Sequence, residues 1–227
     1  MNTTKALMIF FIAGSLAACN SANLGEKAET GEAVEVKQVE GEKVVYAVNP
    51  QTSVINWKGS KPTKVHHGTI DVKNGELEVK NGEIVGGKFA IDMKSIVNHD
   101  IEDEEWNTKL VGHLHSDDFF STETYPEATF EISSVKPYTG ETVEGEVTPT
   151  HVITGNLTIK GITKSISFNA MVNSDGNNIV AESVPFTVDR AEWDVRYQSK
   201  KFFDDLKDDF IHDDIGIQIK INSSATS

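Results

Sequence analysis

Hydrophobic and polar residues alternate along most of the chain from Lys43 onward. In the clearest segment, Ile215 to Asn222, every second residue is isoleucine, and Lys164 to Val172, Val152 to Lys160 and Lys88 to Lys94 show the same period. Successive side chains of a β-strand point to opposite faces, so a period of two predicts strands with one buried and one solvated face. This favours antiparallel pairing, because strands of parallel sheets are apolar on both faces.

Turn signals separate the alternating segments: Asn74-Gly75, Asn81-Gly82, Lys160-Gly161 and Asp175-Gly176. Such dipeptides favour tight hairpins, so we expect eight or nine strands that follow one another within one domain. The arrangement predicts an all-β fold, either a closed antiparallel barrel or a sandwich. A short helical or irregular piece is expected from Ser199 to Lys207.

The longest candidate for a helix runs from Ile101 to His115. Asp103 is placed to cap its first turn, and Trp106, Leu110 and Leu114 fall four apart on one face. A meander barrel with a helix across one end has a lipocalin-like geometry and can enclose an apolar cavity. The alternation alone leaves open whether the interior is hollow or filled by side chains.

The amino terminus carries a separate signal. Lys5 is followed by an apolar stretch from Ala6 to Ala13, which is the pattern of a signal peptide. The sequence Leu16-Ala17-Ala18-Cys19 then resembles the lipobox of bacterial lipoproteins. The resemblance implies that residues 1–18 are removed and that Cys19, the one cysteine of the chain, carries the lipid. An ordinary secretory peptide with a chance cysteine is the alternative.

The segment after this cysteine has a different composition. Asn20 to Glu42 is rich in Ala, Ser, Gly, Glu and Lys and has no aromatic residue, which predicts a flexible tether over residues 19–42. A poorly formed amphipathic helix around Glu32 to Lys37 is the alternative. The barrel domain is expected over residues 43–222, followed by a short tail of residues 223–227.

Composition narrows the classes of function. The chain has 227 residues and a formal net charge of -14, which argues against nucleic-acid binding. No apolar run reaches the roughly 20 residues of a membrane-spanning helix. Hydrolase, zinc-protease and nucleotide-loop motifs are absent. We therefore expect no enzyme, assign no catalytic residue and expect no cofactor.

Several motifs share one resemblance: Tyr46–Asn49, Ser53–Trp57, Gly112–Phe120, Tyr125–Phe130, Thr154–Lys164 and Val188–Trp193. In their order and spacing they are similar to the YceI-like, polyisoprenoid-binding-protein-like family, from about Val44 to Asn222. The resemblance implies an eight-stranded antiparallel, lipocalin-like barrel with an elongated apolar cavity. It also implies that some members hold a long isoprenoid chain, such as a polyprenyl phosphate or a quinone, and that members are usually secreted or periplasmic.

The inward positions of the predicted strands supply candidate ligand-binding residues. An apolar chain can bind by buried area alone, because each buried CH₂ contributes roughly 0.8 kcal/mol. The alternative is that these side chains simply fill the barrel. The candidates are Trp57, Phe89, Ile91, Phe130, Leu157, Phe168 and Phe186.

A local positive cluster stands out in this acidic chain: Lys58, Lys61, Lys64, His66 and His67. We assign Lys64, His66 and His67 to a head-group site, because a pyrophosphate would need positive charge against the overall negative field. A solvated loop that balances nearby acids is the alternative. A neutral quinone would not need the cluster.

The spacing of the histidines argues against a metal site, and the two arginines have a structural explanation. Adjacent His66 and His67 point to opposite faces of a strand, so they rarely share a metal ion, and His113 and His115 are misaligned on a helix. We assign no metal site. For Arg190 and Arg196 we favour carboxylate pairs that close one barrel end over contacts with a phosphate.

The sequence thus predicts a lipid-anchored protein of the cell envelope, facing the periplasm, that sequesters or carries an amphiphilic, polyisoprenoid lipid. One alternative is an envelope interaction or stress scaffold with a packed barrel and no lipid ligand. Another is a metal-dependent enzyme. Association of two barrels as a homodimer is left open.

Overall fold

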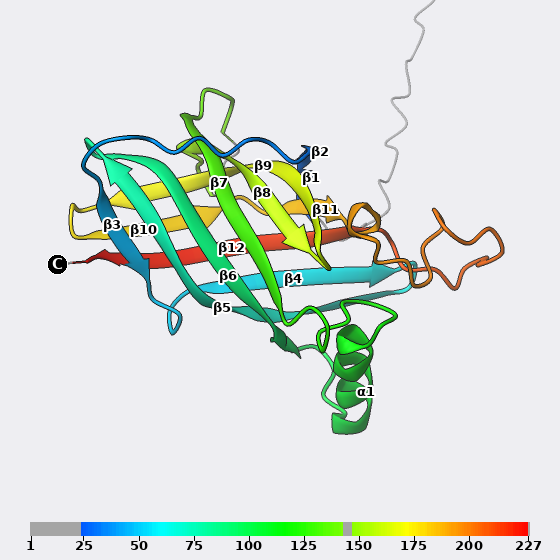
Figure 1. The fold of residues 1–227 in the computed structure, drawn as a ribbon. Helices are drawn as coiled ribbons and strands as arrows, with labels where there is room; N and C mark the ends of the chain where they lie inside the picture. Colours follow the sequence, from blue (N-terminus) through cyan, green and yellow to red (C-terminus); the bar gives the residue numbers. More distant parts are fainter. Residues whose placement is uncertain (1–23, 143–146, 227) are drawn as a thin grey trace, which may run out of the picture.

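The computed structural model describes residues 24–142 and 147–226. In these ranges twelve strands form one sheet, accompanied by one α-helix and one short 3₁₀ helix (Figure 1). The elements are β1 (Glu26–Lys27), β2 (Glu29–Glu32), β3 (Val44–Val48), β4 (Val54–Lys61), β5 (Lys64–Lys80), β6 (Glu83–Asn98), α1 (Glu104–His115), β7 (Glu127–Pro137), β8 (His151–Ile159), β9 (Ile162–Ser174), β10 (Asn178–Ser183), β11 (Phe186–Asp189), η1 (Arg190–Trp193) and β12 (Asp214–Ala225).

Eight of the strands close on themselves. The order β12-β10-β9-β8-β7-β6-β5 is completed by β4, which pairs with both β5 and β12. All pairings in this strand ring are antiparallel. The predicted all-β fold, with eight antiparallel strands around an apolar interior, is confirmed.

The alternation in the sequence corresponds to the two faces of the ring. Phe89, Ile91 and Met93 of β6 are buried, as are Ile166 and Phe168 of β9. The residues between them on each strand are more exposed. Burial of one face of every strand in a common interior is therefore the main source of stabilisation.

Three of the four predicted turns form. Asn81 and Gly82 have φ of 55° and 86°, Lys160 and Gly161 have 49° and 74°, and Gly176 has 89°, as tight hairpins require.

The fourth predicted turn, at Asn74-Gly75, is wrong. Both residues lie inside β5, next to a register shift between Val72 and Asn74. Gly75 stands opposite Phe89, and a Cβ on Gly75 would lie 2.8 Å from the Phe89 ring. This glycine therefore provides space for an inward ring and does not turn the chain.

Helix α1 begins at Glu104, three residues after the predicted start at Ile101 and directly after the expected cap. Asp103 caps it, and its Oδ1 accepts a hydrogen bond of 3.0 Å from the backbone N–H of Trp106. Leu114 is buried and Leu110 packs against the core, but the Trp106 side chain is 63% exposed. The expectation that Trp106 shares the packed face is wrong: its ring lies in solvent, with the Lys109 ammonium 4.5 Å from the ring centroid.

The amino-terminal segment corrects the predicted tether. β1 pairs in parallel with β11, and β2 pairs antiparallel with β9. Ala28 between them is buried and donates a 2.9 Å hydrogen bond to Thr187 O. We call residues 24–32 the strap, because they are held against the ring (Figure 1). Backbone hydrogen bonds between strands need no hydrophobic pattern, so the composition of this segment did not indicate that it pairs with β11 and β9.

The other boundary predictions also need adjustment. Residues 33–40 form neither a helix nor a strand, so the alternative helix around Glu32 to Lys37 is absent. The expected tail begins inside β12, where Ser223, Ser224 and Ala225 pair with β3. The predicted signal peptide and Cys19 lie outside the described residues. Within the described ranges, no helix has the length and apolar character needed to cross a membrane.

Candidate functional site

The strand ring encloses an apolar cavity of about 360 Å³. Helix α1 lies at one end of the ring and contributes Leu110, His113 and Leu114 to the cavity wall (Figure 1). The volume falls in the range of about 300–1,000 Å³ that is typical of small-molecule pockets. The interior is therefore hollow here, which counts against the alternative of a ring filled by its own side chains.

Most of the predicted lining residues reach this cavity. Trp57, Ile91, Phe130, Leu157 and Phe186 line it. Phe89 and Phe168 do not: they line a second apolar cavity of about 70 Å³ further along the ring, which Ile91 and Phe130 also contact. Contact of any of these side chains with a ligand stays a prediction.

Four buried phenylalanine rings form a continuous row in the interior of the strand ring. The centroids of Phe89 and Phe130 are 6.4 Å apart, those of Phe130 and Phe168 5.7 Å, and those of Phe168 and Phe186 4.6 Å. The last pair is stacked, with an interplanar angle of 6°. Such contacts make the ring positions well defined.

The predicted head-group cluster is only partly assembled. His66 lines the cavity, but Lys64 and His67 are absent from its wall. Lys64 pairs with Lys61 at the tip of the β4–β5 hairpin, where Lys61 forms a 2.9 Å ion pair with Asp209. Of the three predicted head-group residues, only His66 therefore lies at the cavity wall, and contact of any of them with a head group stays a prediction.

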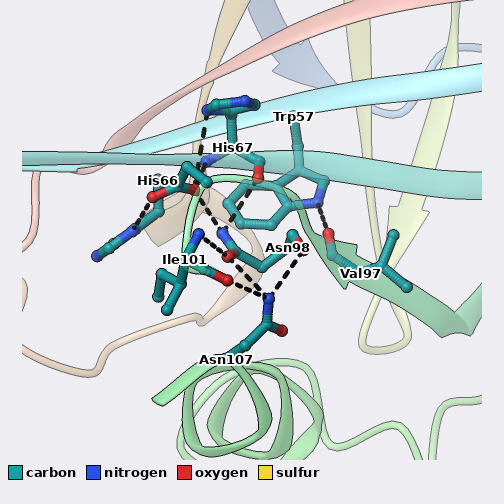
Figure 2. A network of polar contacts seen from close by, with 8 residues as sticks. Trp57, His66, His67, Val97, Asn98, Ile101 and Asn107 are labelled. Atoms are coloured by element: carbon teal, nitrogen blue, oxygen red, sulfur yellow. Dashed lines mark hydrogen bonds and ion pairs between the residues drawn. The ribbon is translucent and has the colours of Figure 1, made fainter. Parts of the chain in front are cut away.

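Asp100 holds the two histidines in place. Its Oδ2 lies 2.8 Å from His66 Nδ1, and its Oδ1 accepts a 2.8 Å hydrogen bond from the backbone N–H of His67 (Figure 2). Burial acts to raise the pKa of Asp100, but the hydrogen bonds from His67, His66 and Asn98 outweigh it and hold the pKa below its usual value. Asp100 therefore stays ionised and fixes the His66 ring at the cavity wall.

A polar network extends from this carboxylate to α1. Asn98 donates to Asp100 and to His67 O, and Asn107 of α1 donates to Asn98 O and Ile101 O at 3.1 and 2.9 Å (Figure 2). On the same side, Trp57 Nε1 donates to Val97 O at 3.2 Å. These bonds tie α1 to β5 and β6 and orient the Trp57 indole along the cavity wall.

Several lining residues were not predicted, above all His113, Phe119, Tyr197 and Trp193. The His113 ring packs edge-on against Tyr197 and Phe119, with centroids 4.4 and 5.0 Å away. His113, Phe119 and Trp193 lie within the motifs that carried the family resemblance and Tyr197 lies shortly after the last of them, but all four lie outside the alternating strands. A search restricted to alternation could not have placed them at the cavity.

Arg190 also lines the cavity and has a structural role. It is buried and lies 3.2 Å from Asp213 Oδ1, and it donates to Val195 O at 3.1 Å. Burial lowers the pKa of Arg190, and Asp213 and Asp189 oppose this shift. The carboxylate partner is Asp213 and not the neighbouring Asp189, which instead pairs with Lys27 and Lys201. This arrangement agrees with the prediction that Arg190 pairs with a carboxylate and does not contact a phosphate.

One polar atom at the cavity is unsatisfied. Gln198 lines the cavity, and its Oε1 is buried without a hydrogen-bond partner in the described part of the chain. Its Nε2 donates to Asp209 at 2.8 Å, which fixes the amide. A buried acceptor of this kind is costly unless a donor reaches it. Among the described residues, no group of three or more His, Cys, Asp or Glu is placed to hold a metal ion.

The fold and the cavity define an all-β protein whose antiparallel strand ring encloses an apolar pocket. The chain belongs to the YceI-like family: the profile of the YceI-like domain matches residues 46–223. This confirms the resemblance indicated by the motifs.

Individual relatives agree with this assignment. A UPF0312 protein of Photorhabdus laumondii is 42% identical over 66 residues, which are 29% of this chain and 30% of that protein. A UPF0312 protein of Pseudomonas putida strain W619 is 30% identical over 132 residues, 56% of this chain and 60% of that protein. The matched part thus spans less than two thirds of the length of these relatives.

Two solved structures share the fold. The crystal structure of Burkholderia cenocepacia BcnA has a TM-score of 0.56 at 18% identity, covering 78% of this chain and 99% of that one. A polyisoprenoid binding domain from Saccharophagus degradans, described as implicated in plant cell wall breakdown, has a TM-score of 0.54 at 17% identity, covering 80% and 98%.

Proposed function

We propose that this protein binds an amphiphilic, polyisoprenoid lipid in the cavity of the strand ring and sequesters or carries it at the cell envelope. The observation that carries the proposal is the apolar cavity of about 360 Å³ inside the ring. Each buried isoprene unit would contribute about 3 kcal/mol before ordering costs are subtracted. A few units therefore suffice for affinity, and a binding function needs no reacting group.

The polar groups of the cavity wall support a defined orientation of this lipid. His66, Arg190 and Gln198 all line the cavity, and the Gln198 acceptor lacks a donor in the described residues. A hydroxyl head group at this end would donate a hydrogen bond to Gln198 Oε1, while the isoprenoid tail would lie against the apolar wall. The relative from Saccharophagus degradans, described as a polyisoprenoid binding domain, supports the same class of ligand.

The location of the protein is part of the proposal. The lipobox-like sequence ending at Cys19 supports a lipid anchor, which would keep the strand ring at a membrane and close to a source of lipid ligand.

The proposal predicts that lipid accompanies the purified protein. Native mass spectrometry of the full chain, extracted in mild detergent, should show one added mass, and solvent extraction should release a prenyl lipid. Leu157→Arg places a charge in the cavity wall and should abolish the added mass, whereas Val34→Arg, on the exposed surface, should retain it. Purified protein that carries no lipid, and that takes up no prenyl alcohol supplied in excess, would contradict the proposal.

A further inference from the structure

The two cavities are stacked along the ring, and the order of residues on the strands shows it. On β12, Ile217 lines the larger cavity, Ile219 lines both, and Ile221 lines the smaller one. On β7, Ala128 lines the larger cavity, Phe130 lines both, and Ile132 lines the smaller one. Both of these strands thus pass from one cavity to the other through a single residue that contacts both.

Four such residues form a layer across the interior, which we call the floor: Ile55, Ile91, Phe130 and Ile219. They come from β4, β6, β7 and β12. The floor separates a cavity of about 360 Å³ from one of about 70 Å³.

Phe130 covers the part of the floor next to β8, which supplies no side chain at this height. On β8 the inward position between Leu157 and Ile153 is Gly155, where a Cβ would lie 2.5 Å from Phe130 Cζ. The Phe130 ring therefore occupies the space over Gly155 and continues to Phe168 on β9, 5.7 Å away between centroids. Removal of this one ring would open a passage between the cavities.

We infer that Phe130 sets the length of the isoprenoid chain that the cavity accepts. The inference rests on the proposed lipid binding. The larger cavity holds on the order of a dozen groups of the size of a water molecule, so it fits a short prenyl chain. A longer chain meets the Phe130 ring and must leave its remaining carbons outside, where they gain no burial.

The magnitude of the effect follows from burial. Each additional buried CH₂ changes the affinity by roughly fourfold. Opening the floor adds the smaller cavity and the volume of the ring, which is room for several carbons. The affinity for a long chain relative to a short one should therefore rise by at least about tenfold.

The test compares prenyl alcohols of increasing length, from geraniol and farnesol to geranylgeraniol and solanesol, by their effect on tryptophan fluorescence. The affinity of the full chain should level off after the shorter probes, and Phe130→Ala should let it rise further with the longer ones. Phe130→Leu, which leaves a smaller opening and disturbs the core less, should shift it in the same direction by less. The matched control is Ile153→Ala, which removes core volume from the smaller cavity alone and should leave the dependence on chain length unchanged.

The outcomes separate the two proposals. If the unaltered protein binds none of these alcohols, the proposed function fails and the inference fails with it. If the unaltered protein binds them but both Phe130 variants keep its dependence on chain length, only the inference is overturned. An equal shift in Ile153→Ala would also overturn it, because the floor is intact in that variant.

Discussion

Several side chains at the cavity are held by residues that lie far away in the sequence, and the sequence did not predict these contacts. Asp100 receives hydrogen bonds from His67 and Asn98 and contacts His66, although 33 or 34 residues separate it from the histidines. Gly155 and Gly75 leave space for the Phe130 and Phe89 rings. These pairs depend on strand register, and register is fixed by the closure of the whole ring.

Asp100 provides a prediction at this scale. Its folded-state pKa is lowered, so the stabilisation is present above the unfolded pKa of about 4 and is lost as the pH falls through the folded value. Asp100→Asn should cost about 1–3 kcal/mol at neutral pH. In urea denaturation, the difference from the unaltered protein should shrink steadily below about pH 4.

The matched control for this measurement is Asp208→Asn, which changes an exposed carboxylate on the loop before β12. That variant should remain close to the unaltered protein at neutral pH. A pH-independent loss in Asp100→Asn would show that the carboxylate acts through packing and not through its charge.

At the scale of elements, the sequence predicts best those strands that bury one face. The isoleucines of β12 and the alternation in β6 and β9 identified strands correctly because burial produces the pattern. The pattern cannot reveal elements held by backbone pairing alone. The strap is polar at Glu26, Lys27 and Glu29, so its composition resembles that of a linker, although its backbone pairs with β11 and β9.

The strap also covers an edge of the sheet. β11 pairs with β12 on one side and with β1 on the other, so release of β1 would leave an unpaired edge strand. Lys27 of the strap additionally lies 3.0 Å from Asp214 and 3.3 Å from the buried carboxylate of Asp189. The strap therefore acts as part of the folded domain.

Ala28→Asp tests this role of the strap in the full chain. Ala28 is buried, so a carboxylate there should release β1 and speed amide hydrogen exchange in β11, with little change in β4 and β5. Ala33→Asp places the same charge at an exposed position outside the strands and should leave exchange unaltered. If β11 stays equally protected in Ala28→Asp, the strap contributes nothing to the order of that edge.

At the scale of the whole molecule, the ring creates a site that no local motif describes. The inward direction of Trp57, Ile91, Phe130, Leu157 and Phe186 was predictable from alternation, and all five reach the larger cavity. Assignment of Phe89 and Phe168 to a separate cavity was not predictable, because it depends on their height along the ring. The contribution of η1 and of the segment after α1 depends equally on tertiary packing.

The three tryptophans report directly on the central claim that a lipid chain enters this cavity. Trp57 and Trp193 line it and are 8% and 0% exposed, whereas Trp106 lies on α1 and is 63% exposed. Trp106→Phe leaves only the two cavity tryptophans, and Trp57→Phe combined with Trp193→Phe leaves only Trp106. A brominated prenyl alcohol should quench the first variant strongly and saturably and the second hardly at all; quenching confined to Trp106, or no quenching in either variant, would contradict the account.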